Sequence, residues 1–256
     1  MGLGQRISHY LRASARYVND PAQLRLRRRY FLAPVYEALG KPWVRDQGFK
    51  TILDIGAYVG GFSYTVGALF PEAMIYAFEP LADCYETMMR NVGSSPRFKG
   101  FNLALGERSA EAVFQRNPST TSSSFLDLTA VLTDEFPEMA ATEPVAVKVA
   151  RLDDVAAGLK IDQPLLVKID VQGYEDRVLA GGNATIGKAS LVIVETSFEA
   201  LYRGQPLFDS IYSTFADLGF RYAGSIDHLG HARDGRPLQE DSLFVRGTVH
   251  GPDSLR

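Results

Sequence analysis

Apolar residues follow two different periods along most of the chain. Short, nearly continuous apolar runs alternate with longer segments whose apolar positions repeat every three or four residues. The runs are typical of buried strands, and the repeats are typical of helices that cover a sheet. This alternation predicts an α/β fold with a Rossmann-like, doubly wound sheet of about seven strands. The strands are expected at 51–56, 74–80, 98–106, 165–170, 190–196, 221–226 and 242–247, with shorter ones at 111–114 and 145–149.

The connections between the predicted strands indicate how the sheet closes. No helical repeat separates the last two strands, so the last strand is expected to be antiparallel, and a loop is expected at 227–240. The other connections carry helical repeats, as parallel strands require. These helices are expected at 60–70, 81–93, 174–182 and 208–220.

The N-terminal segment differs from the rest in pattern and in charge. Two helical repeats, at 3–18 and 21–39, precede the first strand, so we expect a helical extension over 1–45 and one main domain over 46–256. Residues 1–45 carry nine Lys and Arg against two Asp and Glu, which leaves the remainder acidic in a chain of net charge −3. The basic helices could face solvent, pair with the acidic body, form a lid or a homo-oligomer contact, or meet an anionic surface.

Composition narrows the class of protein. With 46% hydrophobic and 22% charged residues, the chain is typical of a soluble globular protein. Cys84 is the single cysteine, which excludes an intrachain disulfide and fits a reducing, cytoplasmic location. No apolar run reaches the roughly 18 residues of a transmembrane segment. The acidic body disfavours a nucleic-acid partner.

A glycine-rich turn follows the first strand in the sequence LDIGAYVGG. Gly56 permits a tight turn, and Gly60 permits close approach of a ligand or of the next strand. The Gly-x-x-x-Gly spacing departs from the Gly-x-Gly-x-x-Gly pattern of dinucleotide sites. Asp54, at the strand end, would repel a phosphate but suits a cationic ligand. Ala57 and Tyr58, inside the turn, are expected to line the same ligand.

Two further strand ends carry residues suited to an adenosine. Glu79, followed by Pro80, ends the second strand 19 positions after Gly60 and can accept hydrogen bonds from both ribose hydroxyls. Asn102, or the backbone around Ala104, ends the third strand where an adenine would lie; the competing interpretation is an ordinary turn. A cationic adenosine compound without phosphate is S-adenosylmethionine.

The chain also resembles a known family. The segments ILDIGAYVGGFS, YAFEP, NLALGE, VKVARLDD, VKIDVQGYE and IVETSFE occur in an order similar to that of the FkbM-type methyltransferases, across residues 50–246. The resemblance implies a class I methyltransferase fold and S-adenosylmethionine-dependent O-methylation of sugars, polyketides or other secondary metabolites. One departure is Gln172, which replaces the first Glu of the family pattern K-x-D-x-E-G-x-E.

Acids at the ends of the fourth and fifth strands are candidates for catalysis. Asp170 and Glu195 are expected to be neighbours over the sheet, where one could act as general base for a hydroxyl. Alternatively the pair could hold a divalent metal, which the sequence does not favour, or serve only structural roles beside Lys168. Asp170 is also expected to face the cofactor. His228, in the predicted 227–240 loop, is a third catalytic candidate.

Together these features predict an O-methyltransferase that acts on a small-molecule hydroxylated acceptor. The polar patch at 119–124 is a weaker candidate for acceptor contacts. Two alternatives stay open. The chain could be an inactive S-adenosylmethionine-binding or scaffold module, which the Gln172 substitution would suit, or an NAD-dependent oxidoreductase, which the glycine spacing disfavours.

Overall fold

The structure is a computed structural model that describes residues 30–117 and 123–246. The predicted helix at 3–18, the first part of the one at 21–39 and most of the polar patch at 119–124 lie outside these residues. Within them, the second N-terminal helix is shorter than predicted. It spans α3 (Ala33–Leu39) and does not include residues 30–32, because Pro34 lies in its first turn and marks a helix start.

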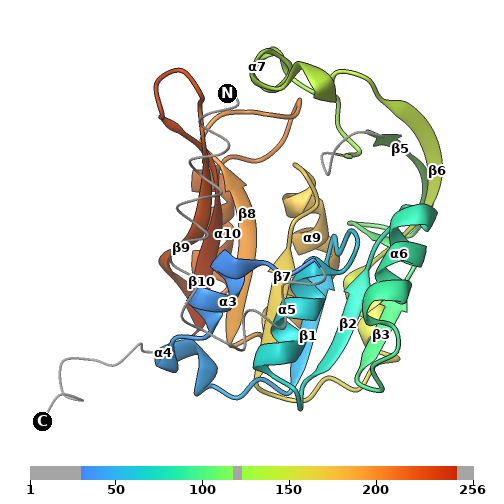
Figure 1. Cartoon of the computed structure of the whole chain (residues 1–256), viewed down its shortest axis with the longest axis vertical. Coiled ribbons are helices and arrows are strands. Elements are labelled where there is room, and N and C mark those ends of the chain that lie inside the picture. The colour runs from blue at the N-terminus through green and yellow to red at the C-terminus, as the bar shows by residue number, and fades with distance from the viewer. Residues whose placement is uncertain (1–29, 118–122, 247–256) are drawn as a thin grey trace, which may run out of the picture.

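The main sheet confirms the predicted α/β, doubly wound fold. Its strand order is β3-β2-β1-β7-β8-β10-β9, and the strands from β3 to β8 are parallel. The last strand is antiparallel to both neighbours, as predicted. Figure 1 shows the strands side by side. They are β1 (Thr51–Ile55), β2 (Met74–Phe78), β3 (Phe98–Phe101), β7 (Leu165–Ile169), β8 (Leu191–Ser197), β9 (Phe220–Gly230) and β10 (Pro237–Arg246).

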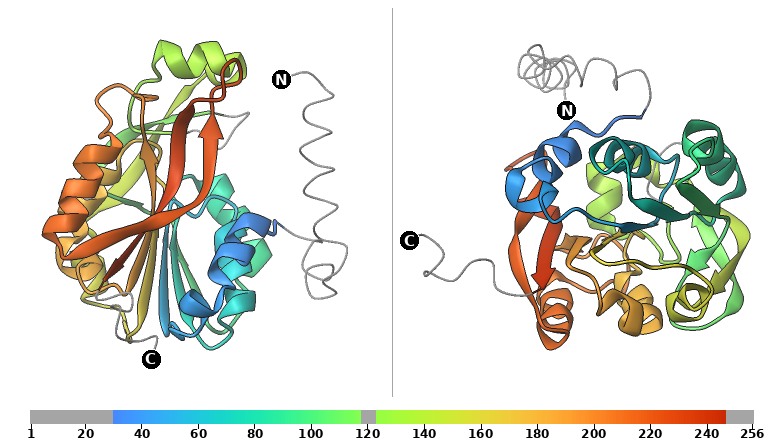
Figure 2. Two further views of the ribbon diagram at one scale, coloured as in Figure 1. Left: turned by 90° about the vertical axis from the view of Figure 1, so that its left-hand side faces the viewer. Right: turned by 90° about the horizontal axis from the view of Figure 1, so that it is seen from below.

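Helices cover both faces of this sheet, and one apolar cluster lies beneath each layer (Figure 2). One layer, which includes Phe62, Val66 and Met88, packs on Ile52 and Ile193 of the sheet. Alternate residues of the same strands point to the opposite layer. The first layer holds α3, α4 (Pro42–Arg45), α5 (Gly61–Leu69) and α6 (Ala82–Val92), and the second holds α8 (Leu152–Ala156), α9 (Glu175–Ile186) and α10 (Phe208–Asp217).

A second, three-stranded sheet corrects the prediction of one strand at 98–106. The chain leaves the main sheet after β3, because the Asn102 amide donates to the carbonyls of Glu79 and Pro80 and turns the backbone. The strand order of this small sheet is β4-β6-β5, and it rises with α7 above one edge of the main sheet (Figure 1). Its elements are β4 (Ala104–Leu105), β5 (Ala110–Arg116), α7 (Ala130–Glu135), η1 (Pro137–Met139) and β6 (Glu143–Ala150).

The predicted loop at 227–240 is also wrong in extent. Strands β9 and β10 form a long hairpin that leaves only 231–236 as its turn, so His228 lies in a strand, opposite Glu240. At the turn, the Ala232 amide donates to the Glu135 carboxylate of α7. The hairpin and the α7 segment therefore meet above the same edge of the sheet.

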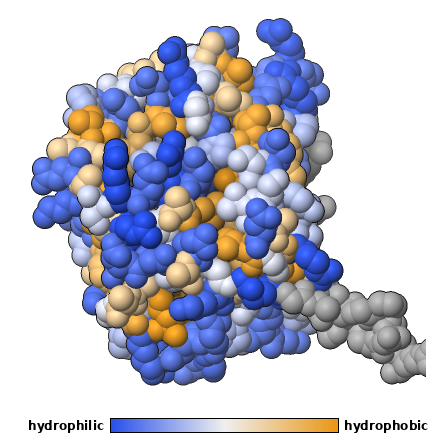
Figure 3. Space-filling view, turned by 180° about the vertical axis from the view of Figure 1, so that it is seen from behind, coloured by the Kyte–Doolittle hydropathy of each residue, from blue (hydrophilic) through white to orange (hydrophobic). Residues whose placement is uncertain are grey.

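The rear face of the molecule and the helices have the polarity that is usual for a globular protein. Seen from behind, hydrophilic side chains predominate, with apolar ones in small separate groups (Figure 3). No helix in the described part of the chain combines the length and apolar character that a membrane span requires.

Candidate active site

A cavity of about 470 Å³ opens at the carboxyl ends of the parallel strands. This volume lies in the range of small-molecule and cofactor sites. In an open parallel sheet the crevice at this edge is the usual ligand position. Of the predicted site residues, the cavity is lined by Gly56, Ala57, Tyr58, Glu79, Pro80, Ala104, Asp170 and Glu195.

A glycine is required at position 56 because the chain just after β7 passes very close to it. It has φ +79°, and a Cβ atom there would lie 1.8 Å from the Asp170 carbonyl oxygen. Gly60, with φ +87°, has a different role, since its Cβ would lie 3.1 Å from Met88 Cγ and 3.2 Å from Val92 Cγ2. Gly60 therefore makes room for α6 and is not part of the cavity wall.

Asp54 lies beneath the glycine turn and does not line the cavity. Its side chain is fully buried and accepts a 2.6 Å hydrogen bond from the Ser63 hydroxyl. Burial raises the pKa of Asp54 above its ordinary value, against the opposing effect of Lys168. Any contact between Asp54 and a ligand in the cavity therefore runs through its neighbours.

Lys168 places a cation between two acids at the cavity wall. Its Nζ donates to the Gly56 carbonyl at 2.9 Å and lies 3.2 Å from Asp170 Oδ2 and 3.7 Å from Asp54 Oδ1. Burial lowers the pKa of Lys168, but the carboxylates of Asp170 and Asp54 outweigh burial and raise it. The lysine thus stays charged, with Asp170 beside it in the cavity.

Glu79 is held in place by backbone amides at the other end of the cavity. Its Oε2 accepts from the Tyr58 N–H at 2.8 Å and its Oε1 from the Leu81 N–H at 2.9 Å. Burial raises the pKa of Glu79 to about 7, although both amides favour the ionised form. Each oxygen keeps a further lone-pair direction for a ligand hydroxyl. Asn102 fixes the backbone of this turn and is not part of the cavity wall.

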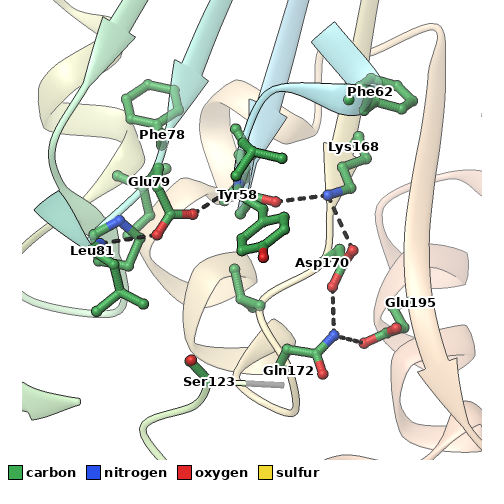
Figure 4. Close-up of a pocket in the computed structure, with 18 of the residues that line it drawn as sticks. Tyr58, Phe62, Phe78, Glu79, Leu81, Ser123, Lys168, Asp170, Gln172 and Glu195 are labelled. Carbon is green, nitrogen blue, oxygen red and sulfur yellow. Dashed lines mark hydrogen bonds and ion pairs between the residues drawn. The ribbon is translucent and has the colours of Figure 1, made fainter. Parts of the chain in front are cut away.

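Gln172 joins the two acids that the sequence proposed for catalysis. Its side-chain amide donates to Asp170 Oδ1 at 2.7 Å and to Glu195 Oε2 at 2.8 Å, as Figure 4 shows. The Tyr202 hydroxyl donates to Gln172 Oε1 at 2.6 Å, which fixes the direction of the amide. The backbone of Gln172 has φ +56°, and its carbonyl accepts from the Ser124 hydroxyl.

The Gln172 bridge argues against the alternative in which Asp170 and Glu195 hold a divalent metal. Both hydrogens of the Gln172 amide point to the carboxylate oxygens that would bind the ion. Within residues 30–117 and 123–246, no three His, Cys, Asp or Glu side chains are placed so that they could hold one metal ion. The Asp170–Glu195 pair as arranged therefore does not fit a bridging cation.

A third acid, Asp241, extends the pair across the sheet. Asp241 of β10 lies directly opposite Glu195 of β8, and both line the cavity. Burial raises the pKa of Asp241 to about 7, with Asp170 adding to the shift. Burial also raises the pKa of Glu195 well above its ordinary value, with Asp170, Glu175 and Asp241 contributing. Asp170, Glu195 and Asp241, called the acid row below, form one end of the cavity.

The structure separates some predicted residues from the site and adds others. His228 is exposed on β9 and does not line the cavity. Lys168 and Gln172 belong to the motif VKIDVQGYE, which could have indicated them. Asp241 precedes the run SLFVR; in an antiparallel strand this places it at the carboxyl edge of its parallel neighbours, a signal that the sequence contains.

Comparisons with known proteins place the chain in a family. The family model for the methyltransferase FkbM domain matches residues 54–222. The 2-O-methyltransferase NoeI of Sinorhizobium fredii (strain NBRC 101917 / NGR234) is 29% identical over 160 residues, which are 60% of this chain and 66% of NoeI. The antimetabolite synthetase AmbE of Pseudomonas aeruginosa is 27% identical over 173 residues, covering 56% of this chain and 8% of AmbE. The chain thus matches just under two thirds of the first relative and a small part of the second.

Solved structures of methyltransferases are similar to the chain only at low identity and at TM-scores below 0.5. A methyltransferase FkbM from Methylobacillus flagellatus KT has a TM-score of 0.48 and 14% identity, covering 88% of this chain and 58% of that one. The magnesium protoporphyrin IX methyltransferase of Synechocystis PCC 6803 has a TM-score of 0.44 and 12% identity, covering 83% and 78%.

Proposed function

Because the chain belongs to the FkbM methyltransferase family, by a match that covers residues 54–222, we propose that it is an S-adenosylmethionine-dependent O-methyltransferase of a small hydroxylated molecule. The observation that carries this proposal is the polarity of the cavity. One end holds the Glu79 carboxylate, the other end holds the acid row, and Lys168 lies between them. Such a cavity suits a ligand with hydroxyls at one end and a group that carries both a positive and a negative charge in the middle, where Lys168 and Asp170 lie side by side.

The Glu79 end supports the adenosine part of the cofactor. The two backbone amides fix both carboxylate oxygens, so the remaining lone pairs accept the two ribose hydroxyls together. Leu81, Ala104 and Phe114 line the adjoining wall with apolar surface, which suits the faces of an adenine ring. This is the arrangement expected of a nucleoside, and the buried Asp54 beneath the turn disfavours a pyrophosphate.

The middle of the cavity supports the methionine part. A methionine tail carries an ammonium and a carboxylate, and Asp170 and Lys168 offer the opposite charges 3.2 Å apart. Tyr58, a residue that is 40% exposed, lines the same region from the glycine turn. The sulfonium methyl would then face the acid row, where the acceptor binds.

The acid row supports an acceptor that donates hydrogen bonds. Carboxylates orient hydroxyl groups and repel phosphates and carboxylates, so a neutral polyhydroxylated compound suits this end. The relative NoeI is named as a 2-O-methyltransferase, which favours oxygen as the accepting atom. Holding that oxygen in line with the methyl carbon supplies much of the rate enhancement, since effective molarities of oriented pairs reach about 10⁵–10⁸ M.

The test is a binding measurement that needs no acceptor. Isothermal titration calorimetry with S-adenosylhomocysteine and, separately, NAD⁺ should show binding of the first compound alone. Binding of NAD⁺ without S-adenosylhomocysteine would replace the proposal by the oxidoreductase alternative. Turnover of S-adenosylmethionine with hydroxylated acceptors then separates an enzyme from a scaffold that binds the cofactor.

A further inference from the structure

We propose that Asp241 is the general base that removes the proton from the acceptor hydroxyl, an assignment that rests on the proposed methyltransferase function. In this step the hydroxyl oxygen bonds to the methyl carbon of S-adenosylmethionine. The carbon–sulfur bond breaks and its electron pair stays on sulfur, which gives S-adenosylhomocysteine. The hydroxyl proton passes to the Asp241 carboxylate and is later released to water.

Strand register places Asp241 in the acceptor half of the cavity. Asp241 pairs with Glu195, and two residues along, Leu243 pairs with Ile193. Successive residues of a strand alternate between faces, so Asp241, Glu195 and Ile193 share the face that forms the cavity wall. Ile226, on the neighbouring strand β9, lines the cavity beside them.

Asp241 is the member of the acid row whose carboxylate accepts no hydrogen bond from the described residues. Asp170 is engaged at both oxygens, by the Gln172 amide at 2.7 Å and by Lys168 at 3.2 Å. Glu195 accepts from the same amide at Oε2. Neither oxygen of Asp241 takes a hydrogen bond from the residues described in 30–117 and 123–246. Its carboxylate is therefore available to a ligand hydroxyl.

The protonation states agree with this division of roles. The charged groups that act on Asp241 are Lys168 on β7, Asp170 just after it, Glu195 on β8, Asp227 on β9 and Glu240, the preceding residue of its own strand. Burial, with this acidic surrounding, raises the pKa of Asp241 to about 7, so a large fraction is ionised at neutral pH. Burial likewise raises the pKa of Glu195 well above its ordinary value, with Asp170, Glu175 and Asp241 adding to the shift. A base is most effective when its pKa is near the working pH.

The experiment compares three isosteric variants, Asp241→Asn, Glu195→Gln and the control Asp227→Asn. Asp227 is a nearby exposed acid that does not line the cavity. Turnover of tritium-labelled S-adenosylmethionine is measured with a panel of p-nitrophenyl glycosides, and S-adenosylhomocysteine affinity by calorimetry. We expect Asp241→Asn to bind S-adenosylhomocysteine within about threefold of the parent and to lose about 10²–10⁴-fold in kcat/KM.

The pH profile and the comparison of the variants distinguish Asp241 from Glu195 as the general base. The parent should show an acid limb near pH 7 that Asp241→Asn lacks, while Asp227→Asn keeps the limb, moved slightly to lower pH because one negative charge near Asp241 is removed. Glu195→Gln, which leaves the proposed base in place, should retain more activity than Asp241→Asn. A larger loss in Glu195→Gln, or an unchanged limb in Asp241→Asn, would assign the base to Glu195 and overturn the proposal.

A stability measurement decides the matter if the parent turns over no glycoside. Because the folded-state pKa of Asp241 lies above its unfolded value, ionisation destabilises the fold as pH rises from about 4 to about 7. Asp241→Asn should therefore raise Tm by about 2–4 °C at pH 8 and leave it unchanged at pH 4, with no such gain in Asp227→Asn. A lower Tm at both pH values would show that the carboxylate has a structural partner and overturn the proposal. Failure of the parent to bind S-adenosylhomocysteine would instead refute the proposed function.

Discussion

The backbone of Gly56 lies so close to Asp170 that an added Cβ atom would sit 1.8 Å from its carbonyl oxygen. The Asp170 amide donates to the Ile55 carbonyl, and Lys168 donates to the Gly56 carbonyl, so the two strand ends are fastened together. This contact fixes the junction between the two parts of the cavity that we propose for the cofactor and for the acceptor. Its tightness has a direct consequence for substitution.

Gly56→Ala should destabilise the protein by at least about 3 kcal/mol, because the methyl group meets backbone and the residue has φ +79°. The matched control is Gly48→Ala. Gly48 also has positive φ, at +61°, but nothing lies within 4 Å of its added Cβ, so about 1–2 kcal/mol is expected. Urea unfolding monitored by circular dichroism measures both. Equal losses in the two variants would contradict the steric explanation.

Glu79→Gln should weaken S-adenosylhomocysteine binding about tenfold to a hundredfold at pH 8, because charged acceptors of the ribose hydroxyls are lost. The parent should bind more tightly as pH rises from 5.5 to 8.5. The folded-state pKa of Glu79 is about 7, and only the ionised form accepts both hydroxyls while also holding both amides. Calorimetry across this range tests the slope, which Glu79→Gln should reduce. A slope identical in both proteins would remove Glu79 as its source.

Gln172→Glu should lower the free energy of unfolding by about 2–4 kcal/mol at pH 8, because a carboxylate replaces the amide between two acids. The loss should shrink at pH 5, where the added acid and Glu195 take up protons. Gln47→Glu, at a site whose amide makes only an exposed bond to the Trp43 carbonyl, is the control and should stay within about 0.5 kcal/mol. Denaturant titrations at both pH values provide the comparison.

Turnover should survive removal of divalent metal. The Gln172 amide occupies the position in which a cation would bridge Asp170 and Glu195, so the proposed chemistry relies on the protein's own groups. Dialysis against EDTA, followed by assay with and without added Mg²⁺, checks this. Activity that falls on dialysis and returns with Mg²⁺ would restore the metal alternative.

Residues at the ends of parallel strands could be predicted from sequence because such ends share one edge of a sheet. Glu79, Asp170 and Glu195 each follow an apolar run, and the fold brings all three to the cavity. Gly60 and Asp54 were harder to interpret, since a glycine next to a ligand turn can equally face a helix and a strand-end acid can equally point inward. Their direction depends on packing by α6 and Ser63.

Other features depend on contacts between distant segments and have no local sequence signal. The Gln172 bridge requires φ +56° at that residue and the Tyr202 hydroxyl 30 positions away. The prediction of a loop at His228 is wrong because the length of the hairpin is set by pairing with β10 and not by the turn residues alone. The sequence thus predicts at which edge of the sheet the site lies, but not which side chains contact one another there.

Strand β10 lies between β8 and β9, although β9 precedes it in the chain. The residues proposed for cofactor contact all come earlier, on segments from β1 to β7, whereas Asp241 comes on β10. During synthesis the cofactor half of the cavity therefore leaves the ribosome before the acceptor half can assemble. The same order separates the two parts in the sequence. Substitutions in the β9–β10 hairpin can therefore change which acceptor binds without changing the residues proposed to bind the cofactor.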